Sequence, residues 1–359
     1  MGKKTKAFIV ILIITILLCA LAITYKIFVD KSNIDTGNTN AIDKENKEEN
    51  VIEVEIKTVQ TFKGNERPIA VMIDNHKAAL PQAGLNNAYL VYEIIVEGGE
   101  SRLMALFKGQ DLAKIGPVRS ARHYFLDYAL ENDAIYVHYG WSPQAQSDIS
   151  DMGVNNINGI FESESSFWRV KDKSAPHNVA TSTEKILSIS ERKGYKTTSS
   201  AKSILNYVTN DVNLENGQSA ETVTIPYSDS NIVKYTYDQE TQRYQRYSKG
   251  IEETDWSTGE KVTTKNIIIT FARNATLNDG ENKDRQTLYN VGTLDGYYIT
   301  NGKAIKIKCE KTFRSAQTVY KDLEGNEIDV NDGNTFIQIC PINAKVTIEG
   351  TEDLLQLSN

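Results

Sequence analysis

The pattern of hydrophobic and polar residues divides the chain into four parts. Residues 7–25 contain no charged side chain, residues 30–50 contain almost no hydrophobic one, and patterned segments begin near residue 51. As a helix the uncharged run is about 28 Å long, close to the hydrocarbon thickness of a bilayer, whereas a polar segment cannot bury enough surface to become ordered. We therefore expect an N-terminal membrane anchor (1–29), a flexible linker (30–60) and two folded domains (61–215 and 216–359).

The charges that flank the hydrophobic run predict its orientation. Three lysines precede it, and flanking lysines stay in the cytoplasm, so the folded domains should lie outside the cell membrane behind a single transmembrane helix. The alternative is a signal peptide that is cleaved or lipidated at Cys19. We favour the uncleaved helix, because bulky Leu18 precedes the cysteine and the hydrophobic run continues beyond it.

Residues 61–215 show a mixture of strand and helix patterns. "RPIAVMIDNH" is a hydrophobic run that predicts a buried strand ending at Asp74, and "AYLVYEIIVEGGESRLMALFKG" predicts a hairpin that turns at Gly98-Gly99. Hydrophobic residues spaced by three and four from Ala121 predict a helix with Ser120 as N-cap. A strand, "DAIYVHYG", and a helix that begins at "TSTEKI" follow, so we expect a mixed α/β domain.

From about residue 220 the chain consists of short alternating runs, such as "IVKYTYD", "AIKIKCEK" and "TFIQICP", separated by Gly, Asn and Asp turns. This pattern is typical of an antiparallel β domain. Its tyrosines (Tyr235, Tyr237, Tyr244 and Tyr247) should line one sheet face, where we favour packing across strands over the alternative of a sugar-binding platform. The predicted fold class is therefore α+β, with a mixed α/β N-terminal domain followed by a mainly antiparallel β C-terminal domain.

Composition narrows the range of functions. The 359 residues are 40% hydrophobic and carry a net charge of −7 without a long basic run, so nucleic acid is a poor candidate partner. Cys309 and Cys340 lie in two strand-like runs, and form either a disulfide between neighbouring strands or two buried free thiols. No C-x-x-C spacing occurs in the exported part, which argues against a structural zinc. We expect no metal and no cofactor.

The stretch "IGPVRSARHYF" places Arg119 and Arg122 around the N-terminus of the predicted helix. This end of a helix carries partial positive charge, so two cations are locally unfavourable there. A bound phosphate or carboxylate would resolve the conflict, because guanidinium groups and free backbone N–H groups together bind anions. The alternative is that both arginines pair with nearby Asp or Glu side chains.

Five further residues are candidates for the same ligand-binding site. Asp74 and Asn75 follow a buried strand, Arg102 follows the hairpin turn, His138 lies near the end of its strand, and His177 precedes a helix. Ligands of α/β sheets gather where strands end and loops begin, so these side chains should lie close to Arg119 and Arg122.

Several of these segments together resemble the YerB-like family of bacterial envelope proteins, which are described as lipoproteins of unknown function. The similarity covers roughly residues 60–345 and is most specific in "RPIAVMIDN", "YEIIVEGGESRLMALF", "IGPVRSARHYF", "DAIYVHYGWSPQA", "APHN" and "GNEIDVNDGNTFIQI". The resemblance implies paired N- and C-terminal domains in the cell envelope of a Gram-positive bacterium, and no established activity. Phe336 stands where the family usually has a tryptophan. The strand-strand-Pro-Arg pattern is also loosely similar to the LytR-CpsA-Psr phosphotransferases, although Ser120, not an acidic residue, follows Arg119.

Three functions fit these residues. We favour an extracytoplasmic protein that binds a phosphorylated or otherwise anionic envelope component. The first alternative is a phosphotransferase or hydrolase acting on a polyprenyl-phosphate or glycopolymer, in which the arginines neutralise phosphate and Asp74 or His138 transfers protons. The second is a scaffold for another envelope protein, whose identity the sequence does not indicate.

Overall fold

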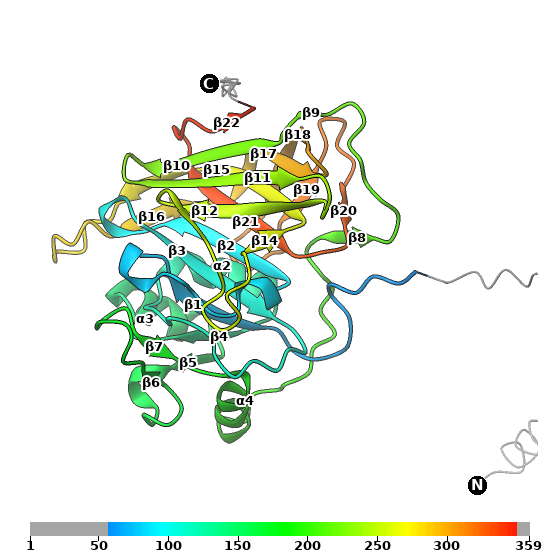
Figure 1. Cartoon of the computed structure of the whole chain (residues 1–359). Helices are drawn as coiled ribbons and strands as arrows, with labels where there is room; N and C mark the ends of the chain where they lie inside the picture. Colours follow the sequence, from blue (N-terminus) through cyan, green and yellow to red (C-terminus); the bar gives the residue numbers. More distant parts are fainter. Residues whose placement is uncertain (1–56, 350–359) are drawn as a thin grey trace, which may run out of the picture. The chain divides into compact units, whose positions relative to one another are not determined.

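A twelve-stranded sheet runs through residues 57–349, which are the part of the chain described by the computed structural model (Figure 1). Its strands are, in order, β19 (Val319–Lys321), β18 (Lys303–Lys311), β17 (Gly292–Thr300), β15 (Asn266–Thr276), β21 (Thr335–Pro341), β2 (Leu90–Ile95), β3 (Ser101–Phe107), β1 (Ile69–Asp74), β4 (Ile135–His138) and β5 (Asn156–Asn158), with β16 (Gln286–Tyr289) paired to β15 and β9 (Gln218–Ser219) to β18. Strands from both predicted domains therefore belong to one sheet.

A second sheet, entirely antiparallel, packs on one face of the first. Its strands are β13 (Ile251–Glu252), β12 (Arg243–Ser248), β11 (Asn231–Asp238), β10 (Thr222–Ser228), β22 (Thr347–Ile348) and β14 (Thr263–Thr264). Two small pairs complete the strands: β20 (Asp329–Asn331) with β8 (Asn206–Val208), and β6 (Trp168–Arg169) with β7 (Val179–Ala180). The prediction of a mixed α/β N-terminal half and a largely β C-terminal half is confirmed.

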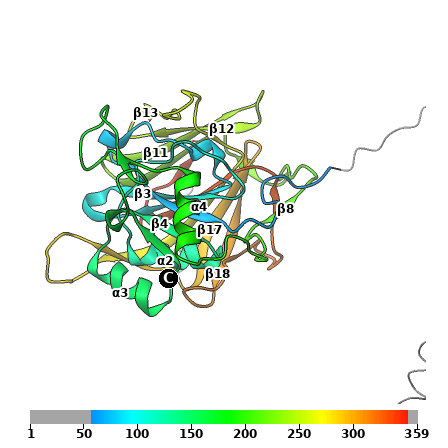
Figure 2. The same ribbon diagram turned by 90° about the horizontal axis from the view of Figure 1, so that it is seen from below.

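The segments predicted in the N-terminal half form as expected. β1, β4 and the β2–β3 hairpin are present, and the hairpin turns at Gly98 and Gly99 with φ of 65° and 73°, which only glycine adopts readily. The helices are α2 (His123–Glu131), α3 (Pro143–Asp151) and α4 (Thr183–Arg192), and the 3-10 turns are η1 (Lys77–Ala79), η2 (Leu85–Asn87), η3 (Glu97–Gly99) and η4 (Gly159–Phe161). Figure 2 shows α2 and α3 next to each other.

The predicted N-cap of α2 is wrong. The cap residue is Arg122, whose side chain makes no capping hydrogen bond. Ser120 instead donates its hydroxyl to the Tyr139 carbonyl (3.0 Å), and Ala121 donates its backbone N–H to Gly140 (2.9 Å). Because these bonds hold residues 120–121 extended beside the end of β4, the helix begins only at His123.

Strand β21 departs from the predicted antiparallel arrangement. It pairs in parallel with β15 on one side and with β2 on the other, so that Phe336 lies opposite both Ile267 and Val91. This one strand joins the sheet of the C-terminal half to that of the N-terminal half.

Three of the four predicted tyrosines share a sheet face. Tyr237 and Tyr244 lie opposite each other on β11 and β12, with ring centroids 5.1 Å apart, and Tyr235 is fully buried. Tyr247 belongs to the other face, where Lys234 lies 4.5 Å from its ring centroid. Cross-strand packing therefore accounts for the tyrosines.

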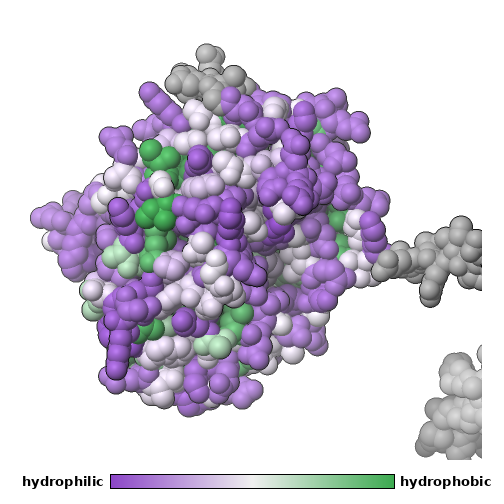
Figure 3. All heavy atoms as spheres, in the orientation of Figure 1, coloured by the Kyte–Doolittle hydropathy of each residue, from purple (hydrophilic) through white to green (hydrophobic). Residues whose placement is uncertain are grey.

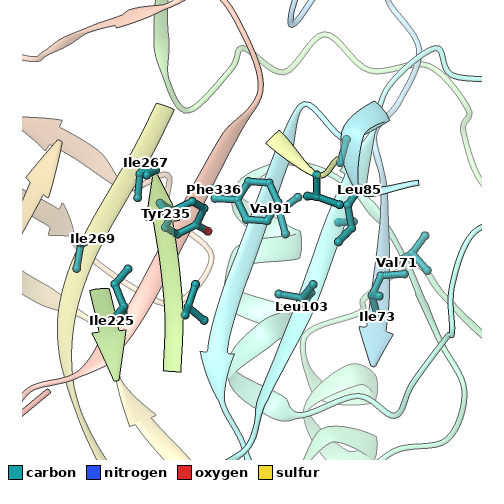
Figure 4. Packing of buried hydrophobic residues seen from close by; sticks show 14 of the residues in the cluster. Val71, Ile73, Leu85, Val91, Leu103, Ile225, Tyr235, Ile267, Ile269 and Phe336 are labelled. Carbon is teal, nitrogen blue, oxygen red and sulfur yellow. The ribbon is translucent and has the colours of Figure 1, made fainter. Parts of the chain in front are cut away.

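Successive side chains of a strand point to opposite faces of the large sheet, and hydrophobic side chains on each face form a core. On β1, Val71 and Ile73 face the smaller sheet, while Met72 faces the side covered by α2 and α3. Figure 4 shows the first core, in which Val71 and Val91 from the N-terminal half belong to the same cluster as Tyr235 and Phe336 from the C-terminal half. The face of the molecule shown in Figure 3 is mostly hydrophilic, with hydrophobic residues in small patches.

The two cysteines in the described residues are free and buried. Cys309 lies on β18 and Cys340 on β21, and strands β17 and β15 separate them, so the prediction of neighbouring strands is wrong. Of the two alternatives, buried free thiols are what the structure contains. Burial raises the pKa of Cys309 to about 12.

The predicted anchor and most of the predicted linker lie outside the described residues. Within residues 57–349 no helix has both the length and the hydrophobicity needed to cross a bilayer.

Candidate functional site

Asp74 is the point at which three segments of the N-terminal half meet. It ends β1 opposite Arg102 on β3 and is buried. The loop through Pro117 runs alongside β1, since the Asp74 N–H donates to the Pro117 carbonyl (2.8 Å) and the Arg119 N–H donates to Met72 (2.9 Å). This pairing holds the Arg119 guanidinium beside the carboxylate, with Nε 3.2 Å from Oδ2 of Asp74.

His177 reaches the same carboxylate from a third segment. Its Nδ1 lies 2.7 Å from Oδ2 of Asp74. The ring of His76, directly after β1, stacks on that of His177, with centroids 4.3 Å apart and an angle of 15° between the planes. Nδ1 of His76 accepts the Ala78 N–H (3.1 Å), so the proton of a neutral His76 is on Nε2.

A second carboxylate, Glu97, holds the other two arginines. Glu97 opens η3 at the hairpin turn and forms an ion pair with Arg122, while Arg102 Nη2 lies 3.9 Å from it. Arg102 is buried and also donates to the Ser120 carbonyl (2.6 Å). Burial and then the nearby Arg122 charge lower the pKa of Arg102 to about 10. Burial acts to raise the pKa of Glu97, but Arg122 and Arg102 outweigh it and lower that pKa below its usual value.

These side chains line one cavity of about 350 Å³, which we call the arginine cleft. Its lining consists of Asp74, His76, Val96, Glu97, Glu100, Ser101, Arg102, Arg119, Arg122, His177, Lys283 and Arg285. Glu100 is paired with Lys249 (3.1 Å), and Lys283 and Arg285 are paired with carboxylates of their own loop. The remaining charged side chains are three guanidiniums that share two carboxylates.

Of the seven residues predicted for the site, five line the arginine cleft: Asp74, Arg102, Arg119, Arg122 and His177. Asn75 lies beneath it, fully buried, and donates its side-chain amide to Glu93 (3.0 Å) and Ser101 (2.9 Å). His138 is elsewhere: its Nδ1 lies 2.8 Å from the Gly140 carbonyl oxygen and its Nε2 lies 3.2 Å from Oδ1 of Asn156. Burial lowers the pKa of His138 to about 4.

The two arginines of the "GPVRSAR" stretch are paired with carboxylates. Arg119 pairs with Asp74 and Arg122 with Glu97, as in the alternative we considered from the sequence. The carboxylates are not surface groups, however, since the Asp74 and Glu97 side chains are only 5% and 22% exposed. The pairs therefore form the wall of a cleft.

The cleft contains five charged or titratable residues that sequence reasoning missed: His76, Glu97, Glu100, Lys283 and Arg285. His76 and Glu97 adjoin predicted elements, and Glu97 precedes the glycine pair that makes its turn. Lys283 and Arg285 come from the charged run "DGENKDR" between β15 and β16, and only the fold brings that run to the N-terminal half. Within residues 57–349 no cluster of three or more His, Cys, Asp or Glu side chains is placed to hold a metal ion.

The sequence matches a two-domain family whose function is unknown. Residues 56–196 match the "Protein of unknown function (DUF3048) N-terminal domain" and residues 223–337 match the corresponding C-terminal domain, so the chain belongs to this family. It is 33% identical to "Putative lipoprotein YerB" of Bacillus subtilis (strain 168), over 77% of this chain and 81% of the relative. The crystal structure of YerB from Bacillus subtilis has a TM-score of 0.71 at 32% identity, and the match covers 79% of this chain and 94% of that one. The resemblance found in the sequence is thereby confirmed.

Proposed function

We propose that the protein binds an anionic component of the cell envelope, bearing a phosphate or carboxylate group, in the arginine cleft. The observation that supports this proposal is the charge balance of the cleft wall. Arg102, Arg119 and Arg122 share only Asp74 and Glu97. One positive charge is left over, and the lowered pKa of Arg102 reflects burial and the repulsion between these cations.

An anion in the cleft would compensate that charge. The Arg119 side chain is 25% exposed, so part of its guanidinium faces the cleft while Nε is held by Asp74. Guanidinium groups held in place by carboxylates keep their remaining N–H groups directed at a ligand, which reduces the entropy cost of binding. Lys283 and Arg285 of the 279–285 loop add further donors to the lining of the cleft.

Thermal unfolding with and without anions tests this function. Millimolar phosphate, pyrophosphate or citrate should raise the Tm of the wild-type protein, since a ligand that binds the folded state stabilises it by mass action. Arg119→Gln should abolish the increase, and Arg192→Gln, which changes an exposed arginine outside the cleft, should keep it. A wild-type Tm that responds to none of these anions contradicts the proposal.

The dyad of Asp74 and His177 supports acid–base catalysis as a second candidate function. A carboxylate beside Nδ1 keeps the proton on that nitrogen, which leaves the Nε2 lone pair of a neutral His177 free to accept a proton. In such a hydrolase a water oxygen attacks phosphorus, its proton passes to Nε2, and the bond to the leaving oxygen breaks. Release of inorganic phosphate from a polyprenyl pyrophosphate, lost in His177→Asn, is the expected result. An equal rate in both proteins excludes this candidate.

The location that we propose is the outer face of the cell membrane. The hydrophobic N-terminal segment and the lipoprotein name of the relative from Bacillus subtilis support an anchor of either kind. Substitution of Cys19 distinguishes the two anchors. A lipid-anchored protein incorporates radiolabelled palmitate and loses the label in Cys19→Ala, whereas a protein held by a transmembrane helix incorporates none in either form. In both cases protease added to intact cells should digest the folded part.

A further inference from the structure

A second cavity, of about 510 Å³, lies beside the edge strand β5. One of its walls is formed by α3, and another by the loop from Trp141 and by the turn η4, which carries Phe161. The tryptophan comes from "DAIYVHYGWSPQA", a segment that contributes nothing to the arginine cleft. We call this cavity the tryptophan pocket.

Hydrogen bonds and a ring contact fix the backbone segments that carry the two aromatic side chains of the tryptophan pocket. Oδ1 of Asn158 accepts the backbone N–H groups of Gly140 (2.9 Å) and Ile160 (3.2 Å), so it ties the loop before Trp141 to the turn that carries Phe161. The two rings lie with centroids 5.7 Å apart and an angle of 53° between their planes. His138 supports the same wall, since its ring centroid is 5.6 Å from that of Trp141.

Two neighbouring hydrophobic side chains at this site are largely exposed to solvent. Phe161 is 72% exposed, more than any other large hydrophobic side chain in residues 57–349, and the neighbouring Ile160 is 52% exposed. Adjacent exposed hydrophobic residues beside a cavity are typical of a binding surface.

The polar groups around the rings are mostly amides. Gln146, Asn156 and Asn158 line the pocket. Its one carboxylate, Glu162, is paired with Arg192 and lies 3.9 Å from Lys193. The one surplus positive charge lies on Arg192 and Lys193, whose side chains are 63% and 34% exposed, so water screens it and a charged ligand gains little there. Amide groups, in contrast, both donate to and accept from hydroxyls.

We infer that the tryptophan pocket binds a neutral carbohydrate. A pyranose ring has an apolar C–H face that packs on an aromatic ring, and hydroxyls at its edge that bond to amide side chains. The pocket supplies both on rigid supports, and its volume falls in the range of known ligand sites. This inference is independent of the anion proposed for the arginine cleft, because the two cavities share no lining residue.

The test uses titration calorimetry with neutral oligosaccharides of glucose, galactose, mannose and N-acetylglucosamine. We expect at least one of them to bind, and Phe161→Ser to weaken that binding about tenfold, because it removes the stacking surface. Phe313→Ser is the matched control, since Phe313 is also exposed (60%) and lies outside the pocket. Gln146→Ala, which changes an exposed polar side chain, should weaken binding about threefold.

Two results overturn the inference. The first is that no oligosaccharide of the set binds at millimolar concentration, and the second is that Phe161→Ser and Phe313→Ser bind equally well. If, in addition, wild-type protein self-associates in sedimentation and Phe161→Ser does not, the exposed rings form an interface between protein copies. Phosphate and pyrophosphate should bind equally well to Phe161→Ser and to wild type, which keeps this test separate from that of the arginine cleft.

Discussion

Nδ1 of His177 lies 2.7 Å from Oδ2 of Asp74, although 103 residues separate the two in the sequence. The same carboxylate oxygen is 3.2 Å from Nε of Arg119, and the other oxygen accepts the His76 N–H (3.1 Å). One buried carboxylate thus holds the end of β1, the "GPVRSAR" loop and the loop before α4 against one another.

Asp74→Asn should destabilise the protein by about 2–4 kcal/mol, because it leaves the Arg119 charge without its partner in a part-buried position. Urea unfolding measures the difference. Asp151→Asn, at an exposed position of α3, is the control and should change the free energy of unfolding by less than about 0.5 kcal/mol. Equal stability of both variants would mean that the junction at Asp74 contributes nothing.

Arg246→Gln should be more damaging still. Arg246 is fully buried on β12, 2.7 Å from Glu93 of β2 and paired on its other side with Glu253. Its removal leaves two buried carboxylates without a counter-charge, which costs about 3–5 kcal/mol. The expected outcome is a large drop in Tm or loss of soluble protein, while Lys306→Gln, at an exposed position of β18, stays near wild type. A soluble Arg246→Gln protein with wild-type Tm would contradict this account.

The pH dependence of stability should include a contribution from His138. Burial lowers its pKa in the folded protein to about 4, whereas an unfolded histidine titrates near 6.5. Between these values the unfolded chain binds the proton and the folded chain does not, so stability falls as the pH falls from about 6.5 to about 4. Buried Asp127, whose pKa is raised to about 6, acts in the opposite direction.

His138→Gln removes the histidine contribution alone. Between about pH 7 and pH 4 the His138→Gln variant should lose roughly 3 kcal/mol less of its free energy of unfolding than the wild-type protein. Urea unfolding of both proteins across this pH range gives the comparison. The difference in their free energies of unfolding at neutral pH measures the effect of the altered hydrogen bonds, and it is subtracted. Parallel pH profiles of the two proteins would show that His138 is not protonated differently in the two states.

Cys309 and Cys340 should resist alkylation in the folded protein. Both are buried, and burial raises the pKa of each thiol, so little thiolate forms at neutral pH. Iodoacetamide treatment of native protein, followed by digestion and mass spectrometry, should leave both peptides unmodified. The same treatment in urea should modify both. A peptide joined by a disulfide would refute the structure at these positions.

Local patterns account for the elements that could be predicted from the sequence. The β2–β3 hairpin follows from two hydrophobic runs around Gly98-Gly99, and α2 follows from a repeat of three and four residues. The start of α2 was misplaced because the bonds that occupy Ser120 and Ala121 come from the end of β4, a contact that a local pattern does not contain.

The candidate site was predictable only in part for the same reason. Asp74, Arg102, Arg119, Arg122 and His177 all belong to the first 180 residues and lie next to strand or helix ends. Lys283 and Arg285 come from the loop between β15 and β16 in the C-terminal half. Whether Cys309 and Cys340 lie on neighbouring strands could not be decided from the sequence, because nothing in two isolated strand patterns indicates that β17 and β15 lie between them.

The place of β21 in the large sheet constrains when this protein can fold. Residues 335–341 are near the end of the chain, yet they pair with β2 and so complete the backbone hydrogen bonds of a strand made some 240 residues earlier. Until they arrive, β2 is an edge strand with exposed N–H and C=O groups. Strand β2 therefore lacks one of its two neighbouring strands until residues 335–341 have been synthesised. Completion of the large sheet has to wait until nearly all of the chain has been made.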